Sequence, residues 1–175
     1  MDKPDILNFL HDEFLVPQPE VLELSYDGLE SSVITPEAEK ALKEADLIII
    51  APSNPLVSIL PILKIPGFHK VLQDATAPIL AVSPLIAGKA LKGPADRMLT
   101  SLKYRADAVG VANFYENIAG YFLMDSNDFE LSDEVSKLGM EPYTADILMP
   151  DLAGKVRLAR EILQIYRNVS RVDSK

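Results

Sequence analysis

The sequence contains no cysteine and only two histidines. The absence of cysteine excludes disulfide bonds, thiolate metal sites and a cysteine nucleophile. His11 and His69 are far apart in the sequence and stand in no motif with metal-ligand spacing, and the Gly-x-Ser-x-Gly elbow of serine hydrolases is missing. The sequence therefore indicates neither thiol nor serine-hydrolase chemistry, and we expect both histidines to serve packing or the surface.

The chain also lacks a long basic run, a long apolar run and a recognisable leader. Its formal net charge is −9, and phosphate backbones are bound by clustered lysine and arginine, so we expect no nucleic-acid partner. No apolar stretch reaches the about 18 residues of a membrane-spanning helix, so we expect no membrane partner. Met1–Pro4 has no basic segment followed by an apolar one, unlike a secretory signal. The predicted location is the cytoplasm.

Short apolar runs alternate along the chain with segments of helical spacing. The 175 residues, of which 48% are hydrophobic, are enough for one domain with a sizeable core. Strands are expected at 21–26, 46–51, 78–84, 120–125 and 140–143, and helices at 35–45, 55–64, 67–73, from 94 onward, 106–118, 131–138 and 152–166. This alternation predicts an α/β domain of Rossmann type, with a mainly parallel sheet and helices on both faces.

Three parts are expected along the chain. Residues 1–20 are interrupted by prolines and predict an irregular segment, 21–167 predict the α/β part that binds phosphate, and 168–175 predict a frayed polar tail. Folds of this kind usually begin with a strong strand near the amino terminus, and the first twenty residues do not provide one. We therefore expect the chain to correspond to the later portion of a larger fold.

The most informative stretch is 46–56, where a continuous apolar run ends in Pro52, Ser53, Asn54 and Pro55. Such a run predicts a strand buried on both faces. Asn54 suits a helix N-cap and Pro55 the first helical position, so a tight loop would follow the carboxyl end of the strand, where open parallel sheets bind ligands. Ser53 and Asn54 then either hold a phosphate or only cap the helix.

A second loop, Gly88–Pro94, follows the second expected buried strand and contains Lys89 and Lys92 between Gly88 and Gly93. Two lysines that lead into a helix start are suited to clamp a polyphosphate. The segment is not a Walker A loop, because Ala90 stands where a serine or threonine would meet Mg²⁺. The alternative is a surface loop with solvated lysines. If both loops are functional, they lie at neighbouring strand ends and share one anionic ligand.

Acidic residues near the later strand ends form a third candidate group: Asp125, Asp128 and Asp146. Mg²⁺ sites use one or two carboxylates together with substrate phosphates, and Asp125 ends an expected strand. Aspartate is also common in solvated turns, which remains the alternative for each of the three.

Long motifs in the two loops resemble one known family. Ala51–Ile59 with Pro61–Leu63, Val82–Ala95, Gly110–Ala112 with Tyr115, the strand into Asp125, and Asp146–Met149 occur in the order typical of the 2-phospho-L-lactate transferases of coenzyme F420 biosynthesis. The likeness covers about residues 10–163. We therefore identify the chain as resembling this family over nearly all of its length.

The resemblance implies transfer of a 2-phospho-L-lactate group from a GDP-activated donor, lactyl-2-diphospho-5′-guanosine, to the deazaflavin Fo, with release of GMP and assistance from Mg²⁺. It implies catalytic roles for Lys89 and Lys92 and substrate contacts for Asp125, Asp146 and Met149, and it identifies no metal ligands. The residues implied in nucleotide or phosphate binding are Ser53, Asn54, Pro55, Ser83, Gly88, Lys89, Lys92 and Gly93.

Full-length family members begin with a glycine-rich loop that has no counterpart in this sequence. We therefore expect the carboxy-terminal half of the transferase, which associates with itself or with the missing amino-terminal half because an incomplete α/β domain exposes apolar faces. Two other functions remain open. One is a non-catalytic guanine-nucleotide-binding or assembly module, and the other is a related group transferase with a different substrate, since a fold does not fix its chemistry.

Overall fold

A four-stranded parallel sheet forms the centre of the computed structural model, which describes residues 20–172. The strands are β1 (Ile48–Ile50), β2 (Ile79–Val82), β5 (Tyr121–Asp125) and β6 (Glu141–Ala145), and they lie side by side in that order. All three pairings are parallel, with Ile48 opposite Ile79 and Tyr121 opposite Glu141. The predicted α/β class and parallel sheet are confirmed.

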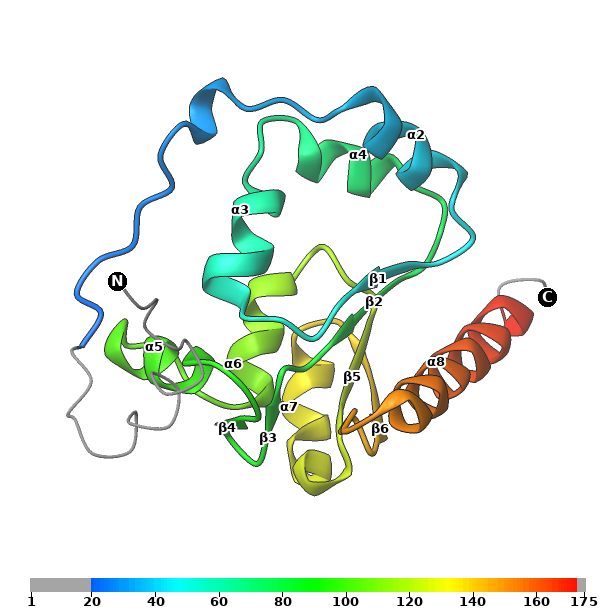
Figure 1. Ribbon diagram of the computed structural model, residues 1–175. Coiled ribbons are helices and arrows are strands. Elements are labelled where there is room, and N and C mark those ends of the chain that lie inside the picture. Colours follow the sequence, from blue (N-terminus) through cyan, green and yellow to red (C-terminus); the bar gives the residue numbers. More distant parts are fainter. Residues whose placement is uncertain (1–19, 173–175) are drawn as a thin grey trace, which may run out of the picture.

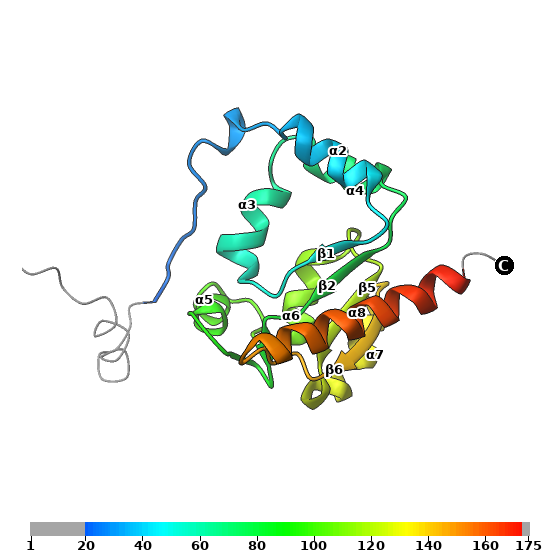
Figure 2. The same ribbon diagram turned by 45° about the vertical axis from the view of Figure 1, so that its right-hand side comes forward.

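Helices cover both faces of this sheet, as the sequence predicts. Each new strand is added on the same side of the previous one, and right-handed crossovers then place the connecting helices on one face. These helices are α3 (Leu60–Leu63), α4 (Phe68–Asp74), α5 (Ala95–Ser101), α6 (Ala108–Ala112) and α7 (Ser132–Lys137). The last helix, α8 (Leu152–Val172), lies on the opposite face (Figures 1 and 2).

Two hydrophobic clusters result, one on each face of the sheet. Side chains alternate along β5, so Phe122 and Met124 enter the larger cluster and Leu123 enters the smaller one beneath α8. The buried stripe of α8 consists of Leu158, Ile162, Ile165 and Val169. Its spacing of three and four residues is that of one helix face, so α8 closes the second layer of the core.

Strand β1 corrects one expectation. Its run of isoleucines predicts burial on both faces, yet Ile49 is 46% exposed whereas Ile48 and Ile50 are buried. β1 is an edge of the sheet among the described strands, and Ile49 points to the face that α8 covers only farther along the sheet. The apolar run is therefore half covered within the described residues.

Several local predictions meet different outcomes. Helix α2 (Pro36–Glu44) begins as expected, because the Thr35 hydroxyl accepts a hydrogen bond from the Ala38 amide. Residues 21–26 form no strand, so that prediction is wrong. Helix α8 continues to Val172, so residues 168–172 are helical rather than frayed. The prediction of an irregular amino-terminal segment falls on residues 1–19, outside the described part.

Most of the helices are short. α2 has nine residues and α6 five, whereas α8 has 21. Between residues 20 and 172 we find no single helix that combines the length and the apolar composition needed to cross a membrane. The segments Pro55–Leu63 and Phe68–Asp74 satisfy both criteria only when taken together, as a pair bent by 77°.

The expected loop after β2 contains a small hairpin, with β3 (Leu85–Ile86) antiparallel to β4 (Lys89–Ala90). Its turn uses left-handed backbone conformations at Ala87 and Gly88, with φ of 47° and 72°. The buried Asp128 carboxylate accepts a hydrogen bond of 3.1 Å from the Ala87 amide. The Asp128 side chain thus secures the hairpin to the segment after β5.

Burial raises the pKa of Asp128, because an ionised carboxylate loses hydration there; the bond from Ala87 lowers it, and the charges of Asp125 and Asp107 raise it further. A raised pKa in the folded state means that the ionised form is penalised by folding. This penalty is absent below the pKa of an unfolded aspartate, about 3.9, and grows as the pH rises through the folded value.

We therefore expect Asp128→Asn to raise the melting temperature at pH 7, since the amide oxygen can still accept from Ala87 without a charge. The gain should shrink as the pH falls toward about 3.9, where the native carboxyl is also neutral. Thermal unfolding followed by circular dichroism between pH 4 and 8 measures this difference. An increase in melting temperature of equal size at all pH values would refute the explanation. Asp133→Asn, on the surface of α7, is the control.

Candidate functional site

A cavity of about 710 Å³ opens at the carboxyl edge of the sheet. β1 and β2 are parallel, so the loops that follow them emerge at the same edge (Figure 1). The segment after β6 and the first turns of α8 close the cavity from the other face. Its lining consists of Pro52, Ser53, Asn54, Val57, Ser58, Ser83, Pro84, Leu91, Lys92, Gly93, Pro94, Ala95, Ile147, Leu148, Met149, Pro150 and Lys155.

The loop after β1 lies at the cavity, but the Asn54 side chain is already engaged. Its Oδ1 accepts from the Leu56 amide at 2.9 Å, and its Nδ2 lies 3.3 Å from the Met98 sulfur. This is the capping alternative, with Pro55 at the first position of the π-helical turn η3 (Pro55–Ile59). The Ser53 hydroxyl has no hydrogen bond to any described residue, and is therefore the freer of the two side chains to meet a ligand.

Ser83, at the end of β2, is fully buried and serves the turn. Its hydroxyl donates to the Leu85 carbonyl at 3.0 Å and accepts from the Leu85 amide at 3.1 Å. Both functions of the hydroxyl are thus used locally. Ser83 shapes the cavity floor through the path of the chain.

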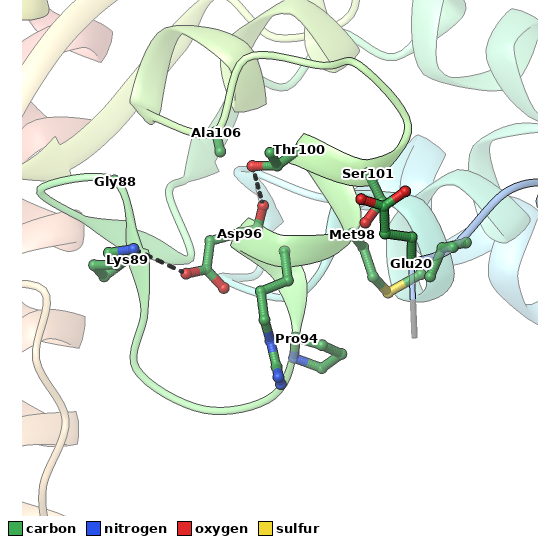
Figure 3. A pocket seen from close by; sticks show the side chains of 11 residues that line it. Glu20, Gly88, Lys89, Pro94, Asp96, Met98, Thr100, Ser101 and Ala106 are labelled. Atoms are coloured by element: carbon green, nitrogen blue, oxygen red, sulfur yellow. Dashed lines mark hydrogen bonds and ion pairs between the residues drawn. The ribbon is translucent and has the colours of Figure 1, made fainter. Parts of the chain in front are cut away.

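The two lysines of the second loop line different cavities. Lys92 and Gly93 line the cavity at the sheet edge, whereas Gly88 and Lys89 line a neighbouring one of about 590 Å³. In the neighbouring cavity the Lys89 ammonium lies 3.9 Å from the Asp96 carboxylate at the start of α5 (Figure 3). Pro94 borders both cavities. The joint clamp of one anion by both lysines stays a prediction, and their positions at two different cavities disfavour it.

Asp125 and Asp146 lie outside the cavity lining and hold one of its walls. The buried Asp125 carboxylate accepts from the Asn127 amide at 3.0 Å and from the Ile147 amide at 3.2 Å. Asp146 accepts from the Leu148 amide at 3.0 Å. Met149, the third residue expected to contact substrate, does line the cavity.

Sequence reasoning missed Lys155, which lines the cavity from α8. No sequence signal marked this residue, because a lysine on an amphipathic helix is ordinarily solvated. Neither aspartate nor glutamate occurs among the lining residues. The cavity therefore presents two ammonium groups, a free serine hydroxyl and apolar walls, which suits an anion attached to an apolar group.

The described residues do not form a protein metal site. Among them, no group of three or more aspartate, glutamate, histidine or cysteine side chains could hold a metal ion. The two buried carboxylates, Asp125 and Asp128, accept hydrogen bonds from backbone amides. The part of the chain that the structure describes thus offers no carboxylate at the cavity to coordinate Mg²⁺.

Comparison with known proteins gives consistent matches. The model of the family "2-phospho-L-lactate transferase CofD" matches residues 8–161. The 2-phospho-L-lactate transferase of Methanocaldococcus jannaschii is 33% identical over 164 residues, which are 93% of this chain and 51% of that protein. The enzyme of the same name from Methanococcoides burtonii is 30% identical over 86% of this chain and 49% of its own length.

Two further relatives broaden the comparison. A phosphoenolpyruvate transferase of Mycolicibacterium smegmatis is 33% identical over 81% of this chain and 43% of its own length. The crystal structure of a upf0052 family protein from Bacillus halodurans has the same fold, with a TM-score of 0.51 at 16% identity over 71% of this chain and 45% of that one. The chain thus spans about half the length of the curated relatives it matches. It belongs to the 2-phospho-L-lactate transferase CofD family.

Proposed function

We propose that this chain is the carboxy-terminal half of a cytoplasmic transferase that moves 2-phospho-L-lactate from lactyl-2-diphospho-5′-guanosine to the deazaflavin Fo, with release of GMP, in coenzyme F420 biosynthesis. The family match supports the reaction class. The observation that carries the proposal is the cavity at the carboxyl edge, which Lys92 and Lys155 line without any acidic residue. An acidic protein that collects two cations and no carboxylate around one cavity is suited to a polyanion.

The reaction needs charge neutralisation and alignment more than a covalent nucleophile. In the proposed transfer, the hydroxyl oxygen of the acceptor bonds to the phosphorus that carries lactate. The bond from this phosphorus to the bridging oxygen breaks, GMP leaves with that oxygen, and the hydroxyl proton is released. Lys92 and Lys155 would neutralise the diphosphate oxygens, while Ser53 would donate a hydrogen bond to the same group.

Mg²⁺, which the resemblance implies, would have to enter bound to the donor. Magnesium keeps several water ligands and is commonly held by substrate phosphates with one or two carboxylates. Because no carboxylate of the described residues lines the cavity, we assign Mg²⁺ no ligand on this chain and no step.

The identity of the acid that the donor carries has an alternative. The Mycolicibacterium smegmatis relative is named for phosphoenolpyruvate rather than phospholactate, which favours a related donor as the alternative substrate. The two acids differ in the carbon skeleton attached to the phosphate, and Leu148 and Met149 are apolar lining residues that could contact it. A non-catalytic guanine-nucleotide-binding module is the other alternative, and it would bind GDP without transfer.

Lys92→Ala and Lys155→Ala should each weaken GDP binding about tenfold, because each removes a charged hydrogen-bond donor worth about 1.5 kcal/mol. Isothermal titration calorimetry at two salt concentrations measures the change, and the loss should be smaller at high salt. Lys70→Ala is the matched control, since Lys70 lies on α4 and pairs with Asp74 on the surface.

Lys89→Ala tests whether Lys89 contacts the same anion as Lys92, as the sequence motif predicts, or lies apart from it. Lys89 lines the neighbouring cavity of about 590 Å³, so we expect its removal to change GDP affinity less than twofold. A loss as large as that of Lys92→Ala would mean that the hairpin rearranges to bring both lysines to one anion. Unchanged affinity in both Lys92→Ala and Lys155→Ala would refute the proposed site.

We also propose that the open face beside β1 is covered by the polypeptide that the longer relatives have beyond the matched region. Ile49 is exposed on β1, and Leu152, Val156 and Leu163 form an exposed apolar stripe on α8. Exposed apolar side chains grouped in this way are typical of an interface. Self-association through the same face is the alternative arrangement.

Light scattering of the isolated chain should give a mass above that of one chain, and Ile49→Lys together with Leu163→Lys should lower it, because charge on the face opposes burial. Leu22→Lys is the control, since Leu22 is also exposed but precedes α2. Transfer of phospholactate to Fo should require the complementary half of a relative in the same tube. A stable monomer that transfers alone would contradict this arrangement.

A further inference from the structure

We infer that Arg157 is a positioning residue for the cavity, because its guanidinium fixes the segment 146–150 that forms one wall. The purpose of the wall rests on the proposed function, whereas the role of Arg157 in holding it rests on contacts alone. Arg157 lies on α8, is not among the cavity-lining residues, and belongs to none of the motifs that the sequence analysis singled out.

The guanidinium bridges two carbonyl groups of the wall. Nη1 donates to the Asp146 carbonyl, and Nη2 donates to the Leu148 carbonyl at 2.7 Å. Nη2 also lies 2.9 Å from the Asp146 carboxylate, and Nη1 lies 3.7 Å from Glu161 one turn later on α8. Residues 146–150 have left β6 and form no helix or strand. Their carbonyls therefore lack ladder partners, and Arg157 supplies two of the missing donors.

Carboxylates hold the amide groups of the same segment. Asp125 accepts from the Ile147 amide, and the Asp146 carboxylate accepts from the Leu148 amide. Four polar backbone groups within three residues are thus fixed: the Asp146 carbonyl, the Ile147 amide, and the amide and carbonyl of Leu148. Such a dense set of bonds restrains the backbone of a short irregular segment.

The wall needs these bonds because its cavity side chains are not held by burial. Leu148 is 41% exposed and Met149 36% exposed, and both line the cavity. Only Ile147, 4% exposed, anchors the segment in the core beneath α8. The direction in which Leu148 and Met149 face the cavity is therefore determined chiefly by the fixed backbone.

Arg157 acts through this segment and not by direct attraction of a ligand. Two carboxylates, Asp146 and Glu161, already balance its charge. Lys155 precedes it by two residues, and side chains two positions apart on a helix point in different directions; Lys155 lines the cavity while Arg157 faces the wall. A lysine at position 157 would keep the charge but not the planar fork that reaches two carbonyls at once.

The test compares Arg157→Lys and Arg157→Ala with Arg160→Ala in the full chain. Arg160 is one turn from Arg157, is exposed, and makes no ion pair with the described residues. Amide hydrogen exchange, followed by nuclear magnetic resonance without any ligand, should become about tenfold faster at Ile147 and Leu148 in both Arg157 variants. The amides of β2 and β5 should keep their native rates, and Arg160→Ala should leave all of them unchanged.

Calorimetry with GDP is the second measurement. Both Arg157 variants should bind GDP about fivefold more weakly, as expected for loss of a preorganised wall, and Arg160→Ala within twofold of the native chain. Native exchange at Ile147 and Leu148 in Arg157→Ala would overturn the inference. So would recovery of native exchange by lysine, which would indicate a role of charge only, or faster exchange throughout the sheet, which would indicate a general loss of stability. If the native chain does not bind GDP, the proposed function fails, while the exchange rates still decide the role of Arg157.

Discussion

The parallel sheet that grows in one direction is the constraint on which the rest of this structure depends. Because β1, β2, β5 and β6 follow one another in space as they do in sequence, right-handed crossovers place every connecting helix on one face. The chain after β6 is then free to return over the other face as α8. The same parallel arrangement brings the ends of β1, β2 and β6 to one edge, where loops from 52, 83 and 146 onward meet around a single cavity. The cavity is thus a consequence of topology before any side chain is considered.

Electrostatics then gives this cavity its chemical character. The chain has a formal net charge of −9, yet the lining residues include two lysines and no acid. Three carboxylates of the loops after β5 and β6 do not line the cavity and bond within the protein: Asp125 and Asp128 accept from backbone amides, and Asp146 pairs with Arg157. These three carboxylates therefore stabilise the cavity wall and the hairpin and do not contact a ligand. An anion at the cavity therefore meets ammonium groups, a hydroxyl and apolar side chains.

Sequence patterns predict what is local and fail where distant segments meet. Local chemistry predicts four features that are confirmed. They are the apolar runs of β2 and β5, the Thr35 cap, and the helix start at Asn54 and Pro55. The division of Lys89 and Lys92 between two cavities was not predictable, because it depends on how the β3–β4 hairpin and α5 pack in the folded chain. Lys155 was missed because a lysine on an amphipathic helix is ordinarily solvated, and only the tertiary position of α8 brings it to the cavity. The half-exposed Ile49 likewise depends on which helix covers β1.

The motifs that carry the family resemblance divide into residues that shape the site and residues that can meet a ligand. Gly110 belongs to the first kind: a Cβ there would lie 1.8 Å from the Arg105 carbonyl oxygen, so only glycine allows α6 to pack against that segment. Asn54, Ser83, Asp125 and Asp146 are also occupied by bonds within the protein. Ser53, Lys92 and Met149 are of the second kind, since they line the cavity and their side chains make no hydrogen bond or ion pair with the described residues. A long motif therefore identifies a family chiefly through the backbone conformation that it enforces. The side chains that face a ligand, including Lys155, which belongs to no motif, are identified only from the folded structure.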